Sequence, residues 1–532
     1  MPTPSPRPAP TRETAPAAPH PTTSRPAPSW GATLAAPPDR PSAPTRALHA
    51  LRAAARSGAA ALTAPTPRTP GHTPSGTAPA PGAAPTSARP APPTRLPRTP
   101  RPYAAALALL AFAVYAAYAL RMHASFRTTG YDLGIFGQAI RSYAQLALPV
   151  SEIRATTGPD PDAPFPLLGD HFHPLLAVLA PLYRLLPHVE TLLVAQAALV
   201  AWSVYVVTRA GGRRIGVAYA LAWGVQKLIG FDFHEVALAL PLLALSLAAY
   251  RAGRWRACAA WGAGLVLVKE DLGATVLVLG LLLLRHDRRA GTALCVLGPA
   301  AAAFAVLLVL PHFNPVGDYT YLSSMGGGTA PGDADLGAPT GLDTKATTLL
   351  VLLLPTLFLA LRSPMILLVL PTLAWRFMSS NPSYWGTDYH YSTVLMPIVF
   401  FALIDALDRR PRPVPHLRTA VLTVAVLLAT ALPLAEALRP AFWQDPPRAS
   451  AARQALARVP DGAKVAATNR LAPHLTDRAT VYLHSPGSPD AKVDWMVLDT
   501  TDTTFSADPP SPTRPGFHQV YASQGYVVLR RT

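Results

Sequence analysis

Apolar stretches separated by short polar segments fill the chain from residue 102 to about residue 437. The first, Pro102–Leu120, is long enough to cross the roughly 30 Å hydrocarbon core of a bilayer as one helix. Ten further stretches have the same character, although several are short: 188–208, 215–230, 236–250, 256–268, 272–284, 291–311, 347–361, 363–377, 392–408 and 417–437. The pattern predicts an all-α polytopic membrane protein with about 11 transmembrane helices.

One apolar segment, Leu175–Leu186, does not fit this series because it is short and because Pro174, Pro181 and Pro187 bracket and interrupt it. If it crossed the membrane, the basic loop 209–214 would lie outside, against the preference of Lys and Arg for the cytoplasmic side. We therefore predict a shallow or re-entrant helix here.

Short loops rich in Lys and Arg then mark the cytoplasmic side, at residues 209–214, 250–256, 285–289, 361–363 and 408–418. The other connections are predicted to lie outside: a large first loop of residues 121–171, and segments 231–235, 268–271, 311–345 and 379–391. Within the first outer loop, Tyr131–Ile140 has apolar residues at helical spacing, which predicts a short helix along the membrane surface.

The two ends of the chain differ from this middle part, 101–440. Residues 1–100 are mainly Pro, Ala, Thr, Ser and Arg, a composition that predicts a disordered cytoplasmic tail. Residues 441–532 are predicted to form a small extracytoplasmic α/β domain. Its expected elements are a helix at Ala449–Val459, a short helix within Asn469–Thr476, and strands at Lys464–Ala467, Thr480–Leu483, Trp495–Asp499 and Gly525–Leu529.

Composition agrees with a multispan membrane protein, since 50% of the residues are hydrophobic and only 14% are charged, against roughly 25% charged in soluble domains. The net charge of +17 comes from the tail and the inner loops, and no basic-plus-aromatic motif accompanies it. Membrane lipids are therefore expected partners and nucleic acid is not. Cys258 and Cys295 both lie in apolar runs, which argues against a disulfide framework.

Four polar clusters interrupt the apolar pattern, and the predicted topology brings all four to the outer face. Ionisable groups beside lipid are costly and usually mark functional sites. The clusters are Asp170-His171-Phe172-His173, Asp232-Phe233-His234-Glu235, Lys269-Glu270-Asp271 and Asp388-Tyr389-His390-Tyr391.

Asp132 precedes the predicted surface helix and has two interpretations. It could be an ordinary N-cap, or a general base that takes a proton from an acceptor hydroxyl. Partial burial at the membrane surface would raise the pKa of its carboxyl toward a useful value.

Asp170, His171 and His173 could bind a divalent metal ion or a phosphate, while Asp170 could also simply cap the following helix. His171 and His173 are two positions apart, so they could bind one ion together only from an extended segment. Pro174 favours extended backbone geometry at His173. The candidate metal ligands are Asp170, His173, Asp232 and Glu270.

The other clusters suggest substrate binding, each with a structural alternative. His234 and Glu235 lie at the start of an apolar helix, and their role could be limited to capping its N-terminus, where the helix dipole favours Glu. Lys269 could anchor a lipid-linked phosphate, or neutralise the two acids beside it. His390 and Tyr391 could contact a phosphate or a sugar hydroxyl, or belong to an interfacial aromatic belt.

The segments YDLGIFGQ, LLGDHFHPLLAVLAPLYRLLP, FDFHEVALALPLL, LVKEDLG and YHYSTVLMPIVF occur in this order between Pro102 and Leu438. VAATNRLAPHLTDRATVY and DWMVLD follow downstream. Together they resemble a family of predicted bacterial membrane proteins, domain of unknown function 2079. That family is similar in layout to the GT-C glycosyltransferases, multispan enzymes whose first outer loop carries an acidic catalytic residue.

The resemblance implies a polyprenyl-phosphate sugar as donor and an envelope glycan or protein as acceptor. It implies Asp132 as the base, with Asp170 as a second catalytic candidate, and Lys269 or His390 as the group that holds the carrier phosphate. The front half of the first loop departs from the commonest family pattern, because it has no paired-acid motif. Two other functions remain open: a transporter or flippase for a lipid-linked or anionic substrate, and a non-catalytic envelope scaffold.

Overall fold

The computed structural model describes residues 99–156, 158, 163–317, 319, 341–410, 415–485 and 492–532. Residues 1–98, expected to be a disordered tail, lie outside the described residues. So does most of the predicted outer segment 311–345.

Helices dominate residues 101–443. They are α2 (Arg101–Ala124), α3 (Ile135–Ala144), α4 (Glu152–Thr156), α5 (Ala180–Leu185), α6 (Glu190–Gly211), α7 (Arg213–Ala220), α8 (Trp223–Ile229), α9 (Ala239–Arg251), α10 (Trp255–Ala263), α11 (Leu272–Leu283), α12 (Arg288–Phe304), α13 (Leu310–Phe313), α15 (Leu342–Leu353), α16 (Leu370–Met378), α17 (Leu395–Asp408) and α18 (Pro415–Ala429). Short 3-10 or π-helical turns join many of them: η2 (Gly130–Gly134), η3 (Leu167–Gly169), η4 (Pro174–Leu179), η5 (Glu235–Leu238), η6 (Gly264–Leu267), η7 (Ala305–Val309), η8 (Leu354–Thr356), η9 (Leu359–Arg362), η10 (Pro364–Val369), η11 (Pro382–Tyr384), η12 (His390–Ser392), η13 (Pro433–Leu438) and η14 (Pro440–Trp443).

Four of these helical segments are long and apolar enough to cross a membrane: Arg101–Ala124, Glu190–Gly211, Arg288–Phe313 and His390–Asp408. Four shorter apolar helices accompany them, Pro174–Leu185, Leu272–Leu283, Pro364–Met378 and Pro415–Ala429. The expected number of about 11 spans is therefore not confirmed. The reason lies in breaks at proline, glycine and polar residues, which split several of the apolar stretches into pieces of fewer than eighteen residues.

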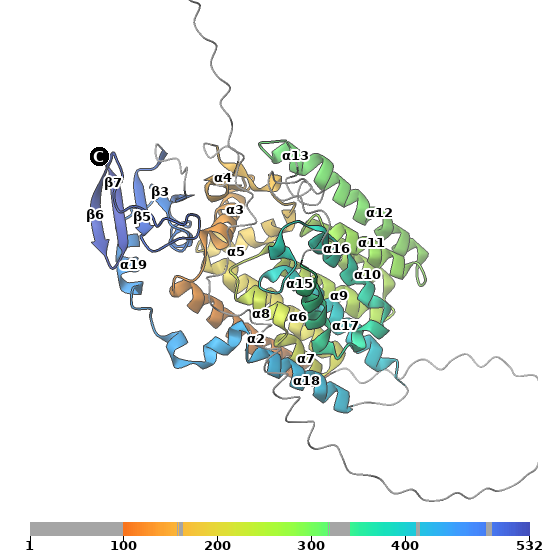
Figure 1. The fold of residues 1–532 in the computed structure, drawn as a ribbon. Helices are drawn as coiled ribbons and strands as arrows, with labels where there is room; N and C mark the ends of the chain where they lie inside the picture. Colours follow the sequence, from red (N-terminus) through yellow and green to blue (C-terminus); the bar gives the residue numbers. More distant parts are fainter. Residues whose placement is uncertain are drawn as a thin grey trace, which may run out of the picture. The chain divides into compact units, whose positions relative to one another are not determined.

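The helices pack into one bundle (Figure 1), and α17 lies in its core. Every residue of α17 except Asp405 and Asp408 is buried, and the helix packs against α6, α9 and η10. A helix that is apolar on all sides belongs in such a core. In contrast, α12 buries only Gly291, Leu294 and Gly298, so most of its surface is available to lipid.

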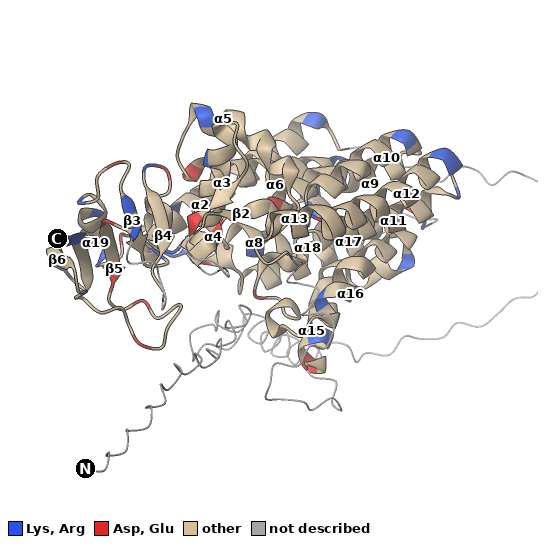
Figure 2. Cartoon of the chain, turned by 90° about the horizontal axis from the view of Figure 1, so that it is seen from above, with Lys and Arg blue, Asp and Glu red and all other residues tan. Residues whose placement is uncertain are grey.

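Charged residues are rare along the helices and gather at their ends (Figure 2). Lys and Arg lie at the turn between α9 and α10 and at the turn between α11 and α12, both predicted cytoplasmic loops. At the same end, Asp408 forms ion pairs with Arg251 and Arg418.

The C-terminal part forms a five-stranded sheet of order β4-β3-β5-β7-β6. Its elements are α19 (Ala449–Leu456), β3 (Lys464–Ala467), η15 (Ala472–His474), β4 (Thr480–Leu483), β5 (Trp495–Asp499), β6 (Phe517–Ser523) and β7 (Tyr526–Arg531). β3 is parallel to β4 and β5, while β7 is antiparallel to β5 and β6. The strands predicted at β3, β4 and β5 are confirmed with the same bounds.

Strand β6 was missed by the sequence analysis. It lies at the edge of the sheet, and no residue in it is fully buried. Its sequence therefore lacks the apolar alternation that identifies a half-buried strand.

The first outer loop and the C-terminal sheet share one hydrophobic core. In the loop, β1 (Val150–Ser151) pairs with β2 (Phe165–Pro166). Helix α4 packs against β4 of the C-terminal sheet (Figure 2). The shared core contains Leu133, Ile140 and Ile153 of the loop together with many residues of the sheet and α19. The C-terminal part is therefore integrated with the loop that contains Asp132.

Close packing of α11 against α12 depends on glycine. A Cβ at Gly273 would lie 2.6 Å from the backbone O of Gly298, which is too close for any side chain. We expect Gly273→Val to cost about 1–3 kcal/mol of stability through overpacking, and to lower the thermal unfolding midpoint in detergent. Ala274→Val is the matched control because Ala274 is exposed one position further along the same helix. Equal midpoints in the two variants would contradict this account of the α11–α12 contact.

Candidate functional site

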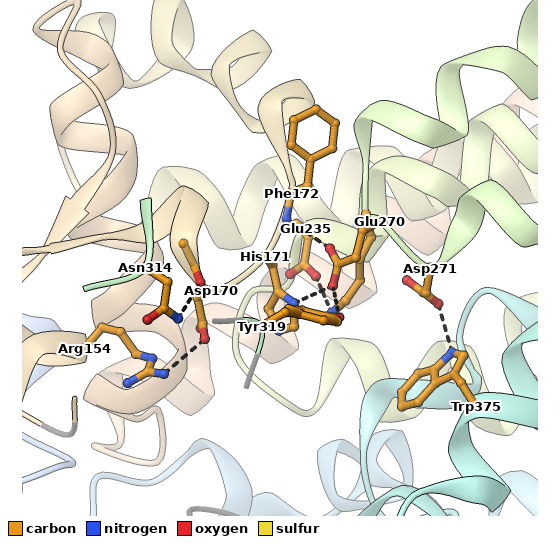
Figure 3. A network of polar contacts seen from close by, with 12 residues as sticks. Arg154, Asp170, His171, Phe172, Glu235, Glu270, Asp271, Asn314, Tyr319 and Trp375 are labelled. Carbon is orange, nitrogen blue, oxygen red and sulfur yellow. Dashed lines mark hydrogen bonds and ion pairs between the residues drawn. The ribbon is translucent and has the colours of Figure 1, made fainter. Parts of the chain in front are cut away.

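Glu270 is the centre of a polar network at the start of α11 (Figure 3). Its Oε1 accepts hydrogen bonds from His171 Nδ1 and from the Tyr319 hydroxyl, each at 2.9 Å. Its Oε2 accepts one from the backbone N–H of Phe172, also at 2.9 Å. Burial alone would raise the pKa of Glu270, but the His171 imidazolium and its hydrogen bond lower it to about 2. The ionised carboxylate thus fixes the segment that carries the first polar cluster.

Lys269 forms the second ion pair of the network, with its Nζ donating to Glu235 Oε1 at 2.9 Å. Burial would lower the pKa of Lys269, but the carboxylates of Glu235, Glu270 and Asp271 raise it, so the ammonium group stays charged. Within the described residues, Lys269 Nζ donates one hydrogen bond, to Glu235 Oε1, and the ammonium group has three donors.

Asp170 pairs with Arg154 of α4, whose guanidinium donates to Oδ1 at 3.1 Å. Burial would raise the pKa of Asp170, but Arg154 and His171 lower it to about 2. Nearby, Asn314 Nδ2 donates to the Gly169 carbonyl at 3.1 Å (Figure 3). A carboxylate with so low a pKa is a weak base, and its place in an ion pair suits it to holding the loop.

Asp132 lies inside the π-helical turn η2, where Thr129 occupies the N-cap position. The capping interpretation of Asp132 is therefore wrong, because a cap must lie before the first helical residue. Among the described residues its partly buried carboxyl has one weak hydrogen-bond contact, 3.5 Å from the Thr129 hydroxyl. Burial, followed by the charges of Asp232 and Glu235, raises the pKa of Asp132 to about 8. This carboxyl can therefore exchange a proton near neutral pH.

Asp232 holds the residue that precedes this turn. Its Oδ2 accepts hydrogen bonds from the Thr129 N–H at 2.8 Å and the Thr129 hydroxyl at 2.6 Å. Gln196 in the middle of α6 fixes the Asp232 segment in turn, since its Nε2 donates to the Asp232 carbonyl at 2.6 Å and its Oε1 accepts from the His234 N–H at 3.0 Å. Asp232 thus links α6 to the loop that contains Asp132.

Three imidazoles gather beside these acids. His234 and His390 stack with their ring centroids 3.5 Å apart and their planes 21° apart. Phe136 contacts His234 and His173, each at 6.0 Å between ring centroids. Within the described residues, Nδ1 of His173, Nε2 of His234 and Nδ1 of His390 are buried and have no hydrogen-bond partner. Buried polar atoms are normally satisfied, so these three call for an explanation.

The structure brings together nearly all of the predicted site residues. Asp132 lies within electrostatic range of Asp232, Glu235 and Tyr391. His390 lies within the same range of His234, Lys269 and Glu235. The predicted convergence of residues from four segments therefore occurs. Asp388 belongs to the fourth polar cluster but was not a predicted site residue, and it is exposed and pairs with Lys227 at 3.8 Å.

The predicted metal site is not present among the described residues, which contain no group of three or more His, Cys, Asp or Glu side chains that could hold a metal ion. The proposed ligands have separate surroundings instead. Asp170 pairs with Arg154, Glu270 with His171, and Asp232 with Thr129, while His173 packs beside Phe136.

Several partners at the site were not found from the sequence: Arg154, Gln196, Tyr319, Trp375 and Arg376. Trp375 Nε1 donates to Asp271 Oδ2 at 2.9 Å. Arg376 is fully buried in α16 and donates to the carbonyls of Tyr384 and Gly386 and to the Ser392 hydroxyl. A signal existed for Gln196 and Arg376, because each is a polar residue within a predicted apolar span.

The long apolar helices and the polar residues gathered at helix ends define a polytopic membrane protein with a polar site at one end of its bundle. The family described as "Predicted membrane protein (DUF2079)" matches residues 122–519, and the chain belongs to it. The resemblance noted from the motifs is thereby confirmed.

Among solved structures, the crystal structure of ArnT from Cupriavidus metallidurans bound to undecaprenyl phosphate is similar at 14% sequence identity and a TM-score of 0.44. The match covers 79% of this chain and 97% of that chain. No curated protein sequence matches the chain.

Replacing Glu270 tests the network. We expect Glu270→Gln to destabilise the protein at pH 7 by about 3–5 kcal/mol, because it removes the buried carboxylate that faces the His171 imidazolium. Since the pKa of Glu270 is below its unfolded value, this difference should shrink as the pH falls from about 4.5 toward 2. Glu436→Gln is the control, because Glu436 pairs with Arg127 at the surface and should contribute about 1 kcal/mol or less. Equal unfolding midpoints for the two variants at pH 7 would rule out the proposed importance of Glu270.

Proposed function

We propose that this membrane protein is an inverting glycosyltransferase of the GT-C type, which moves a sugar from a polyprenyl-phosphate donor to an acceptor of the cell envelope. The observation that carries the proposal is the meeting of three kinds of group in one site. They are an acid whose pKa is raised to about 8, Asp132, a charged Lys269, and buried imidazole nitrogens that have no hydrogen-bond partner among the described residues.

Asp132 would act as the general base. Its carboxylate takes the proton from the acceptor hydroxyl, whose oxygen then attacks the anomeric carbon of the donor from the face opposite the phosphate. The bond between the anomeric carbon and the phosphate oxygen breaks, and the polyprenyl phosphate departs with the electron pair. One displacement of this kind inverts the configuration of the sugar.

Lys269 and the imidazoles would bind the donor. The Lys269 ammonium group can give hydrogen bonds to a phosphate oxygen while it keeps its bond to Glu235. A bound donor would also supply partners for the free nitrogens of His173, His234 and His390. Stabilising the charge that develops on the leaving phosphate is the largest catalytic contribution that such groups make.

Aromatic rings and carboxylates around the site suit a sugar. Trp375 and Tyr384 have ring centroids 5.3 Å apart, and Tyr384 and Tyr391 have centroids 4.9 Å apart. Rings of this kind give an apolar surface for the C–H face of a pyranose, while ionised carboxylates accept hydrogen bonds from its hydroxyls. The aromatic rings and carboxylates would bind the sugar, Lys269 and the imidazoles would bind the phosphate, and the lipid tail would lie against the apolar helices.

The site and the C-terminal domain would face outward and the N-terminal tail would remain cytoplasmic. The distribution of Lys and Arg in the loops supports this orientation. The acceptor would then be an envelope glycan or protein, and membrane lipids would surround the bundle.

Cysteine labelling tests the orientation. With Cys258 and Cys295 replaced by alanine, Asp508→Cys in the C-terminal domain should react with a membrane-impermeant maleimide in intact cells. Arg289→Cys, in the first turn of α12, should react only after the membrane is permeabilised. Both positions are exposed, so access depends on the side of the membrane. The reverse pattern would refute the proposed topology.

A transfer assay tests the reaction. Purified protein is incubated with a panel of radiolabelled polyprenyl-phosphate sugars and membrane acceptors. We expect Asp132→Asn to reduce kcat/KM by about 100-fold or more. Wild-type kcat/KM should rise with pH and level off above about pH 8, because Asp132 accepts a proton only after it has lost its own.

Asp388→Asn is the matched control for this assay, since Asp388 is an exposed acid at the same end of the bundle. Its activity should equal that of wild type. Equal turnover by Asp132→Asn and wild type would remove Asp132 as the base. Protein-dependent movement of the donor across the bilayer without sugar transfer would indicate a flippase instead.

A further inference from the structure

We propose that Asn469 of the C-terminal domain is a positioning residue for Asp132, so that this domain completes the site. The inference rests on the proposed function of Asp132 as the base. Asn469 belongs to the downstream segment VAATNRLAPHLTDRATVY, which the mechanism above does not use.

The π-helical turn that carries Asp132 depends on hydrogen-bond acceptors outside itself. The first N–H groups of any helical turn have no acceptor within it, and the side chain at the N-cap position, Thr129, makes no capping hydrogen bond. Asn469 supplies acceptors for the first two N–H groups of the turn. Its backbone O accepts from the Gly130 N–H at 2.7 Å, and its Oδ1 accepts from the Tyr131 N–H at 3.1 Å. Asn469 therefore performs the task of an N-cap from another domain.

Glycine at position 130 makes this approach feasible. A Cβ there would lie 2.6 Å from the Cβ of Ala472 and 3.3 Å from the carbonyl O of Asn469. Any side chain would push the turn away from the C-terminal domain and lengthen both hydrogen bonds. The sequence of the turn is thus matched to the surface that supports it.

Asn469 is itself held firmly. It is 2% exposed and follows β3 at the carboxyl end of the parallel pair β3–β5. Its N–H donates to Asp502 Oδ2 at 3.0 Å, and Asp502 Oδ1 accepts from the Thr504 N–H at 2.9 Å. A residue fixed in this way can set the position of another segment, whereas a mobile side chain could not.

The turn is also held from the membrane side, where Asp232 accepts the two hydrogen bonds from Thr129. Asp132 therefore lies between one support in the helical bundle and another in the C-terminal domain. The groups that face its carboxyl are the acids Asp232 and Glu235 and the phenols of Tyr131, Tyr389 and Tyr391. The position of Asp132 among these groups sets its affinity for a proton, and π-helical turns are frequent at functional sites for this kind of reason.

Two substitutions with opposite expected effects test the proposal. Asn469→Ala removes the acceptor for the Tyr131 N–H, so kcat/KM should fall about tenfold with little change in KM. The loosened carboxyl becomes better hydrated, and the midpoint of the pH profile should move below the wild-type value. Asn469→Asp keeps an acceptor and adds a negative charge, so activity at high pH should be retained while the midpoint moves upward.

His188→Ala is the control, because His188 contacts Asp477 of the same domain at 3.2 Å with an exposed side chain and lies away from the turn. It should leave both the rate and the midpoint unchanged. A role for Asn469 limited to folding would lower the amount of active protein in both Asn469 variants, without moving the midpoint in either. That result would overturn the proposal.

A second measurement separates this inference from the proposed reaction. Dicyclohexylcarbodiimide reacts with protonated buried carboxyls, and mass spectrometry of the full-length protein can quantify the adduct on Asp132 against pH. The labelling midpoint should lie lower in Asn469→Ala and higher in Asn469→Asp than in wild type. If these shifts occur while no donor supports transfer, Asn469 positions Asp132 and the transferase proposal fails. Identical midpoints in all three proteins would overturn the positioning role.

Discussion

The site depends on keeping carboxylates ionised at the edge of an apolar helical bundle. A buried charge costs several kcal/mol unless a partner of opposite charge and further hydrogen bonds surround it. Glu270 and Glu235 meet this condition through His171 and Lys269, and each pair joins different segments of the chain. The ion pairs therefore fix the geometry of the loops as well as their charge. Asp132 has no such cationic partner among the described residues, and it alone of these acids has a pKa near 8.

Much of the layout followed from hydropathy and charge, because a run of apolar residues that ends at Asp, His or Lys reveals both a helix and its end. This is why the clusters around Asp170, His234, Lys269 and His390 could be expected on one face. The pairings with their partners could not be expected. Arg154 lies 16 positions from Asp170, Gln196 lies 38 positions from His234, and Tyr319 lies 49 positions from Glu270. Spacing along the chain does not encode such pairings. The expected number of spans is not confirmed for a related reason: hydropathy does not show where a helix breaks.

The misreading of Asp132 has a different cause. A residue ahead of an apolar helical pattern looks like an N-cap when only local sequence is considered. In the structure the helical conformation begins earlier, at Gly130, because acceptors from Asn469 in the C-terminal domain are available to it. A helix capped by Asp132 would begin at residue 133. Tertiary contacts place its start three residues earlier, with Thr129 at the N-cap position. Edge strand β6 is a second element that the local pattern does not predict, because pairing with β7 stabilises a sequence without an apolar face.

The central position of α17 has a consequence for biogenesis. This helix, Leu395–Asp408, is synthesised after α6 and α9, yet it fills the space between them. The earlier helices must therefore wait in the bilayer around an unfilled centre until the ribosome has passed residue 408. When α17 inserts, it packs between these helices, and the segment before it brings the His390 ring into contact with His234. Ribosome stalling before this point would leave α6 and α9 without the helix that packs against both of them.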